Sequence, residues 1–494
     1  MQTSTGPRVF DSQWIGGQWV PSDASGTIKV VNPADESVLA EVPDGTARDI
    51  DRAVGAAAEA FDQWSATTVT ERLAFLERLV GRLEARGDEL VEAIVSDVGA
   101  PVPVARQAQV GLAIGIAASF LDIGKSFSYE TRVGNSSVIR QPAGVVGSIT
   151  PWNVPLLLTL QKVVPAIVAG CTVVHKPSEL TPLYAYLLAE ITAECDLPPG
   201  VFNMVVGRGP VAGAELARHP RVDLLSLTGS TRAGRDVIRN SADTVKRLHL
   251  ELGGKNASIV LPDADFDVAV RATVDQACFN TGQTCLQWSR LLVPRDRAAE
   301  VAELAGEVAS GYRVGDPKQE TTDLGPLVSA EALDRVTGHI TRGVAEGARL
   351  VTGGAQRPDG LDRGYFVTPT VFADVDSTMA LSREEIFGPV LSVMAYDTED
   401  DAVRIANETV YGLHGAVWSA SDDHARAVAR RVRTGVIDIN GGSFNILAPF
   451  GGFKQSGYGR ECGAEGLDSF LEVKSIQEPV ATAEVTGPRL RKVE

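Results

Sequence analysis

Short apolar runs, each ending in a turn and leading into a helix-like segment, recur after Gly144 and constrain the fold more than any other feature. This rhythm predicts βα units on a parallel sheet, because consecutive parallel strands need a crossover that is usually helical. We expect strands of the first series at 145–150, 172–175, 202–206 and 224–228. We expect strands of a second series, in a second α/β unit, at 257–261, 289–293, 391–395 and 436–439.

Two amphipathic helices precede the first series. Apolar residues recur there at helical spacing, first at Val54, Ala57, Phe61 and Trp64 and then at Leu73, Leu76, Leu79 and Leu83. A chain of 494 residues is too long for one compact core, so we expect about three packed units.

Two segments have no core of their own. Residues 126–140 alternate around Gly134-Asn135 as a β-hairpin does, and residues 469–476 have the pattern of a terminal strand. They are either surface segments without a partner or strands whose edges pair with another subunit.

Composition narrows the class of partner. With 44% hydrophobic and 22% charged residues, the chain can bury a large core. Its formal net charge of −17 argues against nucleic acid or an anionic membrane as a partner. Residues 1–10 lack the pattern of a secretion signal, and the apolar stretch near 110–121 is short for a membrane span. We therefore expect a cytoplasmic location.

The cysteines indicate neither a disulfide framework nor a metal site. All five are scattered, without a CxxC pair or a Cys/His cluster, so we expect reduced thiols and no bound metal: Cys171, Cys195, Cys278, Cys285 and Cys462. Most free cysteines fill protein cores, and a functional one needs further evidence.

Two glycine-rich loops follow apolar strands and open helices. The loop from Gly207 to Gly213 spaces its glycines too widely for the usual dinucleotide fingerprint, and the loop from Gly229 to Gly234 lacks the Lys-Ser/Thr of a P-loop. Free backbone N–H groups at a helix start still favour a phosphate. Each loop is otherwise a plain connection, since turns of this kind need glycine anyway.

Lys176-Pro-Ser-Glu179 also sits at a strand end, where ligands bind in open α/β sheets. The alternative is a solvated turn in which Ser178 caps a helix. More specific is the pair formed by Glu251-Leu-Gly-Gly-Lys-Asn256 and the loop that ends at Cys285. A carboxylate before two glycines and a thiol in a tight loop suggest a nucleophile and a base, although the thiol needs nearby positive charge or oriented donors to ionise.

Seven segments in this order resemble those of the aldehyde dehydrogenase superfamily, of the NAD(P)-dependent, hydrolytic type, across nearly the whole chain. They are Pro151-Trp152-Asn153, Lys176-Pro-Ser-Glu179, Gly229-Ser230, Glu251-Leu-Gly-Gly-Lys255, Gly282-Gln-Thr-Cys285, Glu385-Ile-Phe387-Gly-Pro and Pro449-Phe-Gly-Gly-Phe-Lys454.

The resemblance implies that an aldehyde is oxidised to a carboxylic acid. Cys285 is then the nucleophile, and Asn153 with the Cys285 backbone N–H forms the oxyanion hole. Hydride transfer leaves a thioester, which Glu251 hydrolyses as general base.

The resemblance also implies a cofactor, NAD with NADP possible. Lys176 and Glu179 would hold the adenine ribose, Ser230 the pyrophosphate, and Glu385 with Phe387 the nicotinamide end. Further contacts are expected along the same segments, at Thr150, Pro151, Trp152, Pro177, Ser178, Gly209, Gly213, Gly229, Gly234, Leu252 and Gly253. Glu179 favours NAD, since a carboxylate accepts from a ribose 2′-hydroxyl and repels a 2′-phosphate.

The implied architecture is α/β, with three parts. A Rossmann-like NAD-binding domain takes residues 1–124 and 145–254, and an α/β catalytic domain takes 255–468. Residues 125–144 and 469–494 form a small β element for oligomerisation, which predicts a homodimer or a homotetramer.

The chain departs from its relatives at the expected aldehyde tunnel. Val154 and Gln161 replace common aromatic residues, and Leu286 and Trp288 follow the nucleophile where small residues are commoner. The tunnel candidates are Val154, Leu157, Leu160, Leu286, Trp288, Phe444 and Phe450. An apolar lining favours a medium-sized hydrophobic aldehyde, although Leu157 or Leu160 could instead face the sheet as core.

Other functions stay open. Trp288 and Phe444 could form an aromatic box for betaine aldehyde. A CoA-acylating semialdehyde dehydrogenase is disfavoured by retention of Glu251. A cofactor-free thiol esterase leaves the cofactor-type segments unexplained, and a structural protein of the same fold would not need an intact Cys285, Glu251 and Asn153.

Overall fold

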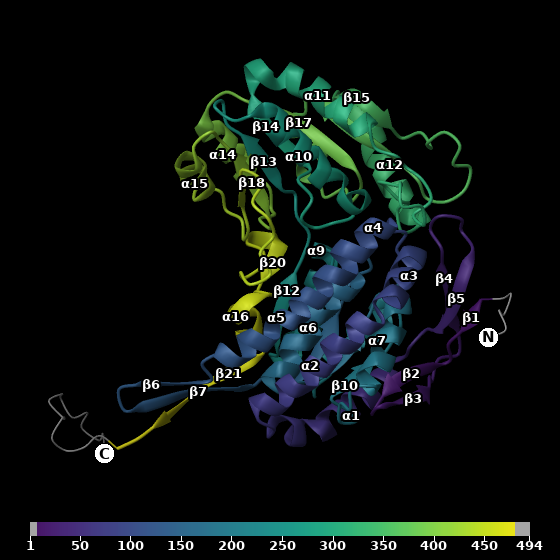
Figure 1. Cartoon of the computed structure of the whole chain (residues 1–494), viewed down its shortest axis with the longest axis vertical. Helices are drawn as coiled ribbons and strands as arrows, with labels where there is room; N and C mark the ends of the chain where they lie inside the picture. Colours follow the sequence, from purple (N-terminus) through teal and green to yellow (C-terminus); the bar gives the residue numbers. More distant parts are fainter. Residues whose placement is uncertain (1–6, 480–494) are drawn as a thin grey trace.

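The structure is a computed structural model and describes residues 7–479. Two twisted, mostly parallel sheets with helices on both faces form the bulk of the molecule, and a narrow β arm extends from it (Figure 1). The α/β fold class predicted from the sequence is therefore confirmed.

The first sheet contains the first series of strands. In spatial order its strands are β20 (Gly457–Tyr458), β12 (Arg247–Glu251), β11 (Leu224–Thr228), β8 (Val145–Ile149), β9 (Thr172–Lys176), β10 (Phe202–Met204), β2 (Ser12–Ile15) and β3 (Gln18–Pro21). The five central strands, β12 to β10, are parallel, and β20 and β2 pair antiparallel at the two sides. From β8 the chain moves outward to β9 and β10 and then returns to β11, so the order reverses between β8 and β11. Such a switch point opens a crevice at the carboxyl ends of the strands.

Helices cover both faces of this sheet because its strands alternate between two apolar cores. Val146 and Val173 face one core and Val145 and Val174 the other. One side carries α1 (Ala47–Ser65), α8 (Ala214–Arg218) and α9 (Thr231–Ser241). The other carries α2 (Val69–Ala85), α3 (Gly87–Asp97), α4 (Val102–Val104), α5 (Leu112–Ser126), α6 (Pro155–Ala169) and α7 (Leu183–Ala193).

The two predicted N-terminal helices are α1 and α2. α1 begins at a capping box formed by Thr46 and Asp49, and α2 at one formed by Thr68 and Glu71. In each box, the side chain of either residue accepts a hydrogen bond from the backbone N–H of the other. These caps satisfy N–H groups that the first turn leaves free. They define where the apolar periodicity seen in the sequence begins.

By length and composition alone, one helical run, Val102–Ser126, could span a membrane. This run extends beyond both ends of the apolar stretch 110–121 considered from the sequence. Its α5 part packs between α2 and α6 and buries Ile116 and Phe120 completely. Packing of this face against the core accounts for part of the apolar composition of the run.

The second sheet contains the second series. In spatial order its strands are β15 (Arg349–Gly354), β16 (Thr368–Ala373), β17 (Val390–Tyr396), β14 (Arg290–Pro294), β13 (Ala257–Val260), β18 (Gly415–Trp418) and β19 (Asp438–Ile439). All pairs are parallel except that of β15 with β16. One face packs on α10 (Phe266–Cys278) and α11 (Ala298–Ser310), and the other on α12 (Ala330–Ala345), α13 (Ala380–Arg383), α14 (Glu399–Asn407) and α15 (Asp422–Ala429).

The arm is the predicted hairpin joined by the predicted terminal strand. β6 (Glu130–Val133) and β7 (Ser136–Pro142) form the hairpin, and β21 (Leu471–Gln477) pairs antiparallel with β7 along its whole length. Residues 480–494 of the expected oligomerisation element lie outside the described residues. A further small sheet near the N-terminus contains β1 (Arg8–Val9), β5 (Val38–Pro43) and β4 (Thr27–Val31).

The end of the second unit differs from the predicted 255–468. β20 joins the first sheet beside β12, and α16 (Gly463–Asp468) packs on α5 and α6. The physical reason is burial, because Phe450, Cys462 and Leu467 all belong to the core around α6. The chain has thus returned to the first unit by Phe450.

Candidate active site

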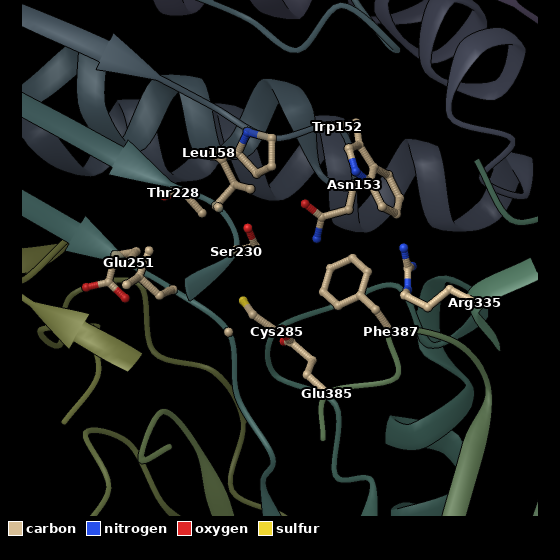
Figure 2. A pocket seen from close by; sticks show the side chains of 14 residues that line it. Trp152, Asn153, Leu158, Thr228, Ser230, Glu251, Cys285, Arg335, Glu385 and Phe387 are labelled. Carbon is tan, nitrogen blue, oxygen red and sulfur yellow. The ribbon is translucent and has the colours of Figure 1, made fainter. Parts of the chain in front are cut away.

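A cavity of about 260 Å³ opens between the two units, at the carboxyl ends of β8, β11 and β12 (Figure 2). It is lined by Pro151, Trp152, Asn153, Leu158, Thr228, Gly229, Ser230, Glu251, Leu252, Gly253, Cys285, Arg335, Glu385 and Phe387. The three predicted catalytic residues therefore share one cavity. Leu158, Thr228 and Arg335 were not predicted.

Cys285 follows a turn that only a small residue can complete. After α10 the backbone at Asn280 and Thr281 is left-handed, with φ of 51° and 58°, and Gly282 follows at 69°. A Cβ on Gly282 would lie 2.2 Å from the carbonyl carbon of Gly388. The glycine thus lets the thiol loop pack directly on the segment that carries Glu385 and Phe387.

Asn153 faces the backbone of this loop. Its Nδ2 donates to the Gln283 carbonyl at 2.9 Å, and Asn280 Nδ2 donates to the Asn153 carbonyl at 3.0 Å. A side-chain amide has two N–H donors, so one is left for another acceptor beside Cys285. This placement suits an oxyanion hole.

The Cys285 thiol is held in its neutral form. Burial, followed by the Glu385 and Glu251 carboxylates, raises the pKa of Cys285 to about 12. The thiolate is the reactive form of cysteine. The site therefore needs additional positive charge near the sulfur before Cys285 can act as a nucleophile.

Glu251 ends β12 and is 3% exposed. Figure 2 shows its carboxyl group directed away from the Cys285 sulfur, and Oε1 lies 3.7 Å from His249 Nε2. Burial and the Glu461 carboxylate raise the pKa of Glu251 well above its usual value. Glu461 itself forms a buried ion pair with Lys162 of α6. Glu251 must turn toward Cys285 to act there as a base.

Glu385 and Phe387 form the opposite wall. Glu385 Oε1 accepts from the Gly254 N–H at 2.9 Å, and a Cβ on Gly253 would lie 2.1 Å from Glu385 Oε2. Phe387 packs edge-to-face on Trp152, with ring centroids 5.4 Å apart. Gly253 and Gly254 thus let the Glu385 carboxylate approach the backbone closely.

Arg335 adds a cation to this wall from α12. Its Nε donates to the Ile386 carbonyl at 3.3 Å, and Figure 2 shows its guanidinium directed toward the side of Trp152. A positive group at the mouth of the cavity suits an anionic part of a ligand.

Lys176 and Glu179 lie in the neighbouring turn, after β9. Lys176 Nζ donates to the carbonyls of Pro177 at 2.7 Å and Gly207 at 2.8 Å, and lies 3.3 Å from Glu179 Oε2. Burial lowers the pKa of Lys176, while Glu179 stays partly exposed. The turn presents an ammonium and a carboxylate together, which suits ribose hydroxyl groups.

The other expected cofactor residues fall into two groups. Ser230 caps α9 by accepting from Ala233 N–H at 3.2 Å and lies at the cavity with Gly229. Five more are not among the cavity-lining residues: Thr150, Pro177, Ser178, Gly209 and Gly213. Gly234 is also outside it, and a Cβ there would lie 2.6 Å from Leu252 Cδ1, so this glycine permits close helix packing.

The tunnel candidates do not all lie together. Val154, Leu286 and the unpredicted Ile446 pack, with Cys285, against the core that contains Leu157, Leu160 and Phe450. Phe444 packs edge-to-face on Phe450 at 5.9 Å. Leu160 is fully buried, as expected of a core residue.

Trp288 lies elsewhere, in the core between the second sheet and α10 and α11. It stacks on His414 and donates to His414 Nδ1 at 2.8 Å. Its expected place in the tunnel, and in an aromatic box with Phe444, is therefore wrong. Two residues before β14, its side chain turns into the sheet's own core.

Comparisons with known proteins agree with this geometry. The model of the aldehyde dehydrogenase family matches residues 19–476. A 3-succinoylsemialdehyde-pyridine dehydrogenase from Pseudomonas sp. is 48% identical over 470 residues, which cover 95% of this chain and 98% of the relative.

Solved structures are similar over almost the whole chain. A mutant of aldehyde dehydrogenase C from Pseudomonas syringae, in complex with NAD+ and octanal, has a TM-score of 0.95 at 46% identity and covers 96% of this chain and 99% of its own. An aldehyde dehydrogenase from Mycobacterium tuberculosis, in complex with NAD+, has a TM-score of 0.93 at 41% identity, with coverage of 96% and 99%. On this fold, this cavity and these matches, the chain belongs to the aldehyde dehydrogenase family.

Proposed function

We propose that the protein oxidises an aldehyde to a carboxylic acid through a thioester on Cys285. The observation that carries the proposal is that Cys285, Asn153 and Glu251 line one cavity together with Glu385 and Phe387. Cys285 comes from the loop after α10, Asn153 from the turn before α6 and Glu251 from the end of β12. Three elements thus converge on one reaction centre.

The residues have the following roles. The Cys285 sulfur adds to the carbonyl carbon, while Asn153 Nδ2 and the Cys285 backbone N–H donate to the oxygen as it becomes negative. Bound NAD would supply the hydride acceptor and a positively charged ring. Glu251 then takes a proton from the water that attacks the thioester, and the acid leaves as the Cys285 thiol is restored.

The residues of the crevice fit a dinucleotide. Glu385 faces the cavity beside Phe387, Ser230 caps a helix whose free N–H groups suit a phosphate, and Arg335 adds a cation. We propose NAD as the preferred cofactor, because the Glu179 carboxylate beside Lys176 accepts from a 2′-hydroxyl and repels a 2′-phosphate. The complexes of two relatives with NAD+ support this choice.

For the substrate we propose a medium-sized hydrophobic aldehyde. Two observations support this choice. Val154 and Leu286 pack with Cys285 against the core that contains Leu157 and Phe450, and Phe444 packs on Phe450, so the residues next to the thiol are apolar. The Pseudomonas syringae relative was solved with octanal. Each buried methylene contributes about 0.8 kcal/mol. A semialdehyde is the second candidate, favoured by the name of the relative from Pseudomonas sp.. Betaine aldehyde loses support, because Trp288 cannot form a box at the tunnel.

We further propose a homodimer or homotetramer in the cytoplasm. The arm leaves the outer edge of β6 unpaired within residues 7–479, and it exposes Val133, Val473 and Ile476. A second arm could pair with this edge. All five cysteines are free thiols, as expected in a reducing compartment.

The experiment is a substrate panel with NAD, scored by reduced cofactor and by mass spectrometry of the product. Hexanal, benzaldehyde, succinic semialdehyde, betaine aldehyde and acetaldehyde separate the candidates. We expect carboxylic acid as the product and the highest kcat/KM with hexanal or benzaldehyde. If no aldehyde of the panel gave a carboxylic acid, the proposed activity would be refuted. If acetaldehyde or betaine aldehyde had the highest kcat/KM, the proposed preference for a hydrophobic aldehyde would be refuted.

A further inference from the structure

A buried imidazole lies beside the Glu251 carboxyl group. His249 and Glu251 are two residues apart on β12 and therefore face the same side of the sheet. His249 Nε2 is 3.7 Å from Glu251 Oε1, and the two side chains are 4% and 3% exposed. Within residues 7–479, neither imidazole nitrogen and neither carboxyl oxygen has a hydrogen-bond partner.

Glycines of the returning segment make room for both groups. A Cβ on Gly459 would lie 2.3 Å from His249 Cδ2, and a Cβ on Gly451 would lie 2.6 Å from Glu251 Oε1. The Phe470 ring packs edge-on to the imidazole from the other side, with centroids 6.4 Å apart. Backbone and ring thus confine the pair to a small space.

The surrounding charges are few and already partly paired. Lys162 of α6 is bound to Glu461, while Arg460 and Arg247 are the other cations that act on His249. Burial, assisted by these cations, lowers the pKa of His249 well below its usual value. Burial and Glu461 raise the pKa of Glu251. In both groups the surroundings therefore favour the neutral form over the charged one.

Two neutral groups of this kind complement each other. A neutral imidazole has one donating and one accepting nitrogen. It can accept a hydrogen bond from the protonated Glu251 or donate one to its carboxylate. A shift of about 1 Å brings the 3.7 Å separation to hydrogen-bond length, and it would remove two costly unsatisfied groups at once.

We propose that His249 is a positioning residue for Glu251: its Nε2–H donates to Oε1 and holds the carboxylate, which is the form that acts as the base, in the position from which it turns toward Cys285. The imidazole stays neutral throughout, in keeping with its burial and the cations around it. The carboxylate is then free to turn toward the thioester. This inference rests on the proposed role of Glu251 in hydrolysis.

The test measures hydrolysis of the thioester against pH in two variants. His249→Leu removes the partner, so the ascending limb of the deacylation rate should move to higher pH by about one unit or more, with the burst of reduced cofactor retained. His249→Gln keeps an N–H donor, so its limb should move less, by about half a unit. The KM for aldehyde should stay within about twofold of the wild-type value in both.

A matched control lies on the adjacent strand. Ser226 of β11 is the register partner of His249, is fully buried and does not bond to Glu251. Ser226→Ala should leave the pH profile where it is. In the double variant Glu251→Gln with His249→Leu, deacylation should be no slower than in Glu251→Gln alone, because His249 acts through Glu251.

The proposal would be overturned if folded His249→Leu protein kept the wild-type pH dependence of deacylation. It would also be overturned if the double variant deacylated more slowly than Glu251→Gln by the factor that His249→Leu causes alone. If His249→Leu does not fold by circular dichroism, an unmoved limb in His249→Gln is enough to overturn it. Wild-type turnover by Glu251→Gln would instead refute the role of Glu251 itself. The results therefore distinguish failure of the proposed role of His249 from failure of the proposed role of Glu251.

Discussion

The Asn256 side chain donates a hydrogen bond to the carbonyl oxygen of Cys285 at 2.7 Å. The same Nδ2 donates to the Gln287 carbonyl at 2.9 Å, and Oδ1 accepts from the His414 N–H at 3.0 Å. One amide thus fixes the backbone at the nucleophile and just after it, and ties both to the strand region of the second sheet. The loop that carries Cys285 is therefore fixed both by Asn256 and by its own left-handed turn at Asn280–Gly282.

Asn256→Ala should therefore weaken both the loop and the fold. Each buried group left without its partner costs about 1–3 kcal/mol, so Tm should fall and kcat should drop by about tenfold or more. Activity and thermal unfolding measure the two effects. Asn240→Ala is the control, because the side chain of this half-buried residue of α9 bonds to the Asp236 carbonyl of its own helix. A kcat within twofold of wild type would show that the loop does not need Asn256.

Cofactor choice should depend on the charge of Glu179. Glu179→Gln keeps a polar side chain beside Lys176 but removes the repulsion of a 2′-phosphate. The kcat/KM for NADP should rise, and that for NAD should fall, so that their ratio changes by about tenfold or more. Steady-state rates with both cofactors measure the ratio. Glu215→Gln, on α8 of the same unit, should leave the ratio unchanged.

An equal preference for NADP in the wild-type protein, or an unchanged ratio in Glu179→Gln, would contradict this account. The measurement separates charge from shape, since Gln and Glu occupy nearly the same volume.

The reactivity of Cys285 should show its raised pKa directly. Burial and the neighbouring carboxylates raise this pKa to about 12, whereas a free cysteine has about 8.5. A raised thiol pKa means less thiolate at every pH below it. Without NAD, alkylation of Cys285 by iodoacetamide should therefore rise about tenfold per pH unit from pH 7 to 10, with no plateau. Peptide mass spectrometry follows the modification.

Cys285→Ala protein gives the background from the other thiols, which are all buried. Addition of NAD should accelerate the alkylation at neutral pH. A plateau below pH 9 without NAD would mean that the thiol is already activated in the protein alone.

Motifs at strand ends could be read from the sequence because they carry their own geometry. Glu251 ends β12, Asn153 follows β8 and Cys285 follows the turn at Gly282, so their meeting follows from the parallel order of the strands. The apolar runs likewise located four strands of each sheet, whereas β12, which ends at Glu251, and β18 were not predicted. Each of these features depends on residues close together in the chain.

Features that depend on distant segments could not be read in this way. β20 has only two residues, and its place beside β12 depends on where the chain returns to bury Cys462 and Phe470. Arg335 has no motif around it, and it reaches the cavity because α12 packs next to the Phe387 segment. Trp288 was misplaced because closeness to Cys285 in sequence does not show which side of the sheet a side chain takes.

The central claim is that Cys285 is acylated and that Glu251 removes the acyl group. Glu251→Gln keeps the size of the side chain but cannot accept the proton from water, so oxidation should proceed once and hydrolysis should stop. Cys285→Ala should show neither step. The amide variant is therefore the one that separates the two halves of the reaction.

The most direct measurement is mass spectrometry of Glu251→Gln after mixing with NAD and hexanal. The account predicts about one equivalent of reduced cofactor per site in a burst, and a mass increase of one hexanoyl group on the Cys285 peptide. Turnover at the wild-type rate with no trapped acyl group on Cys285 would contradict it.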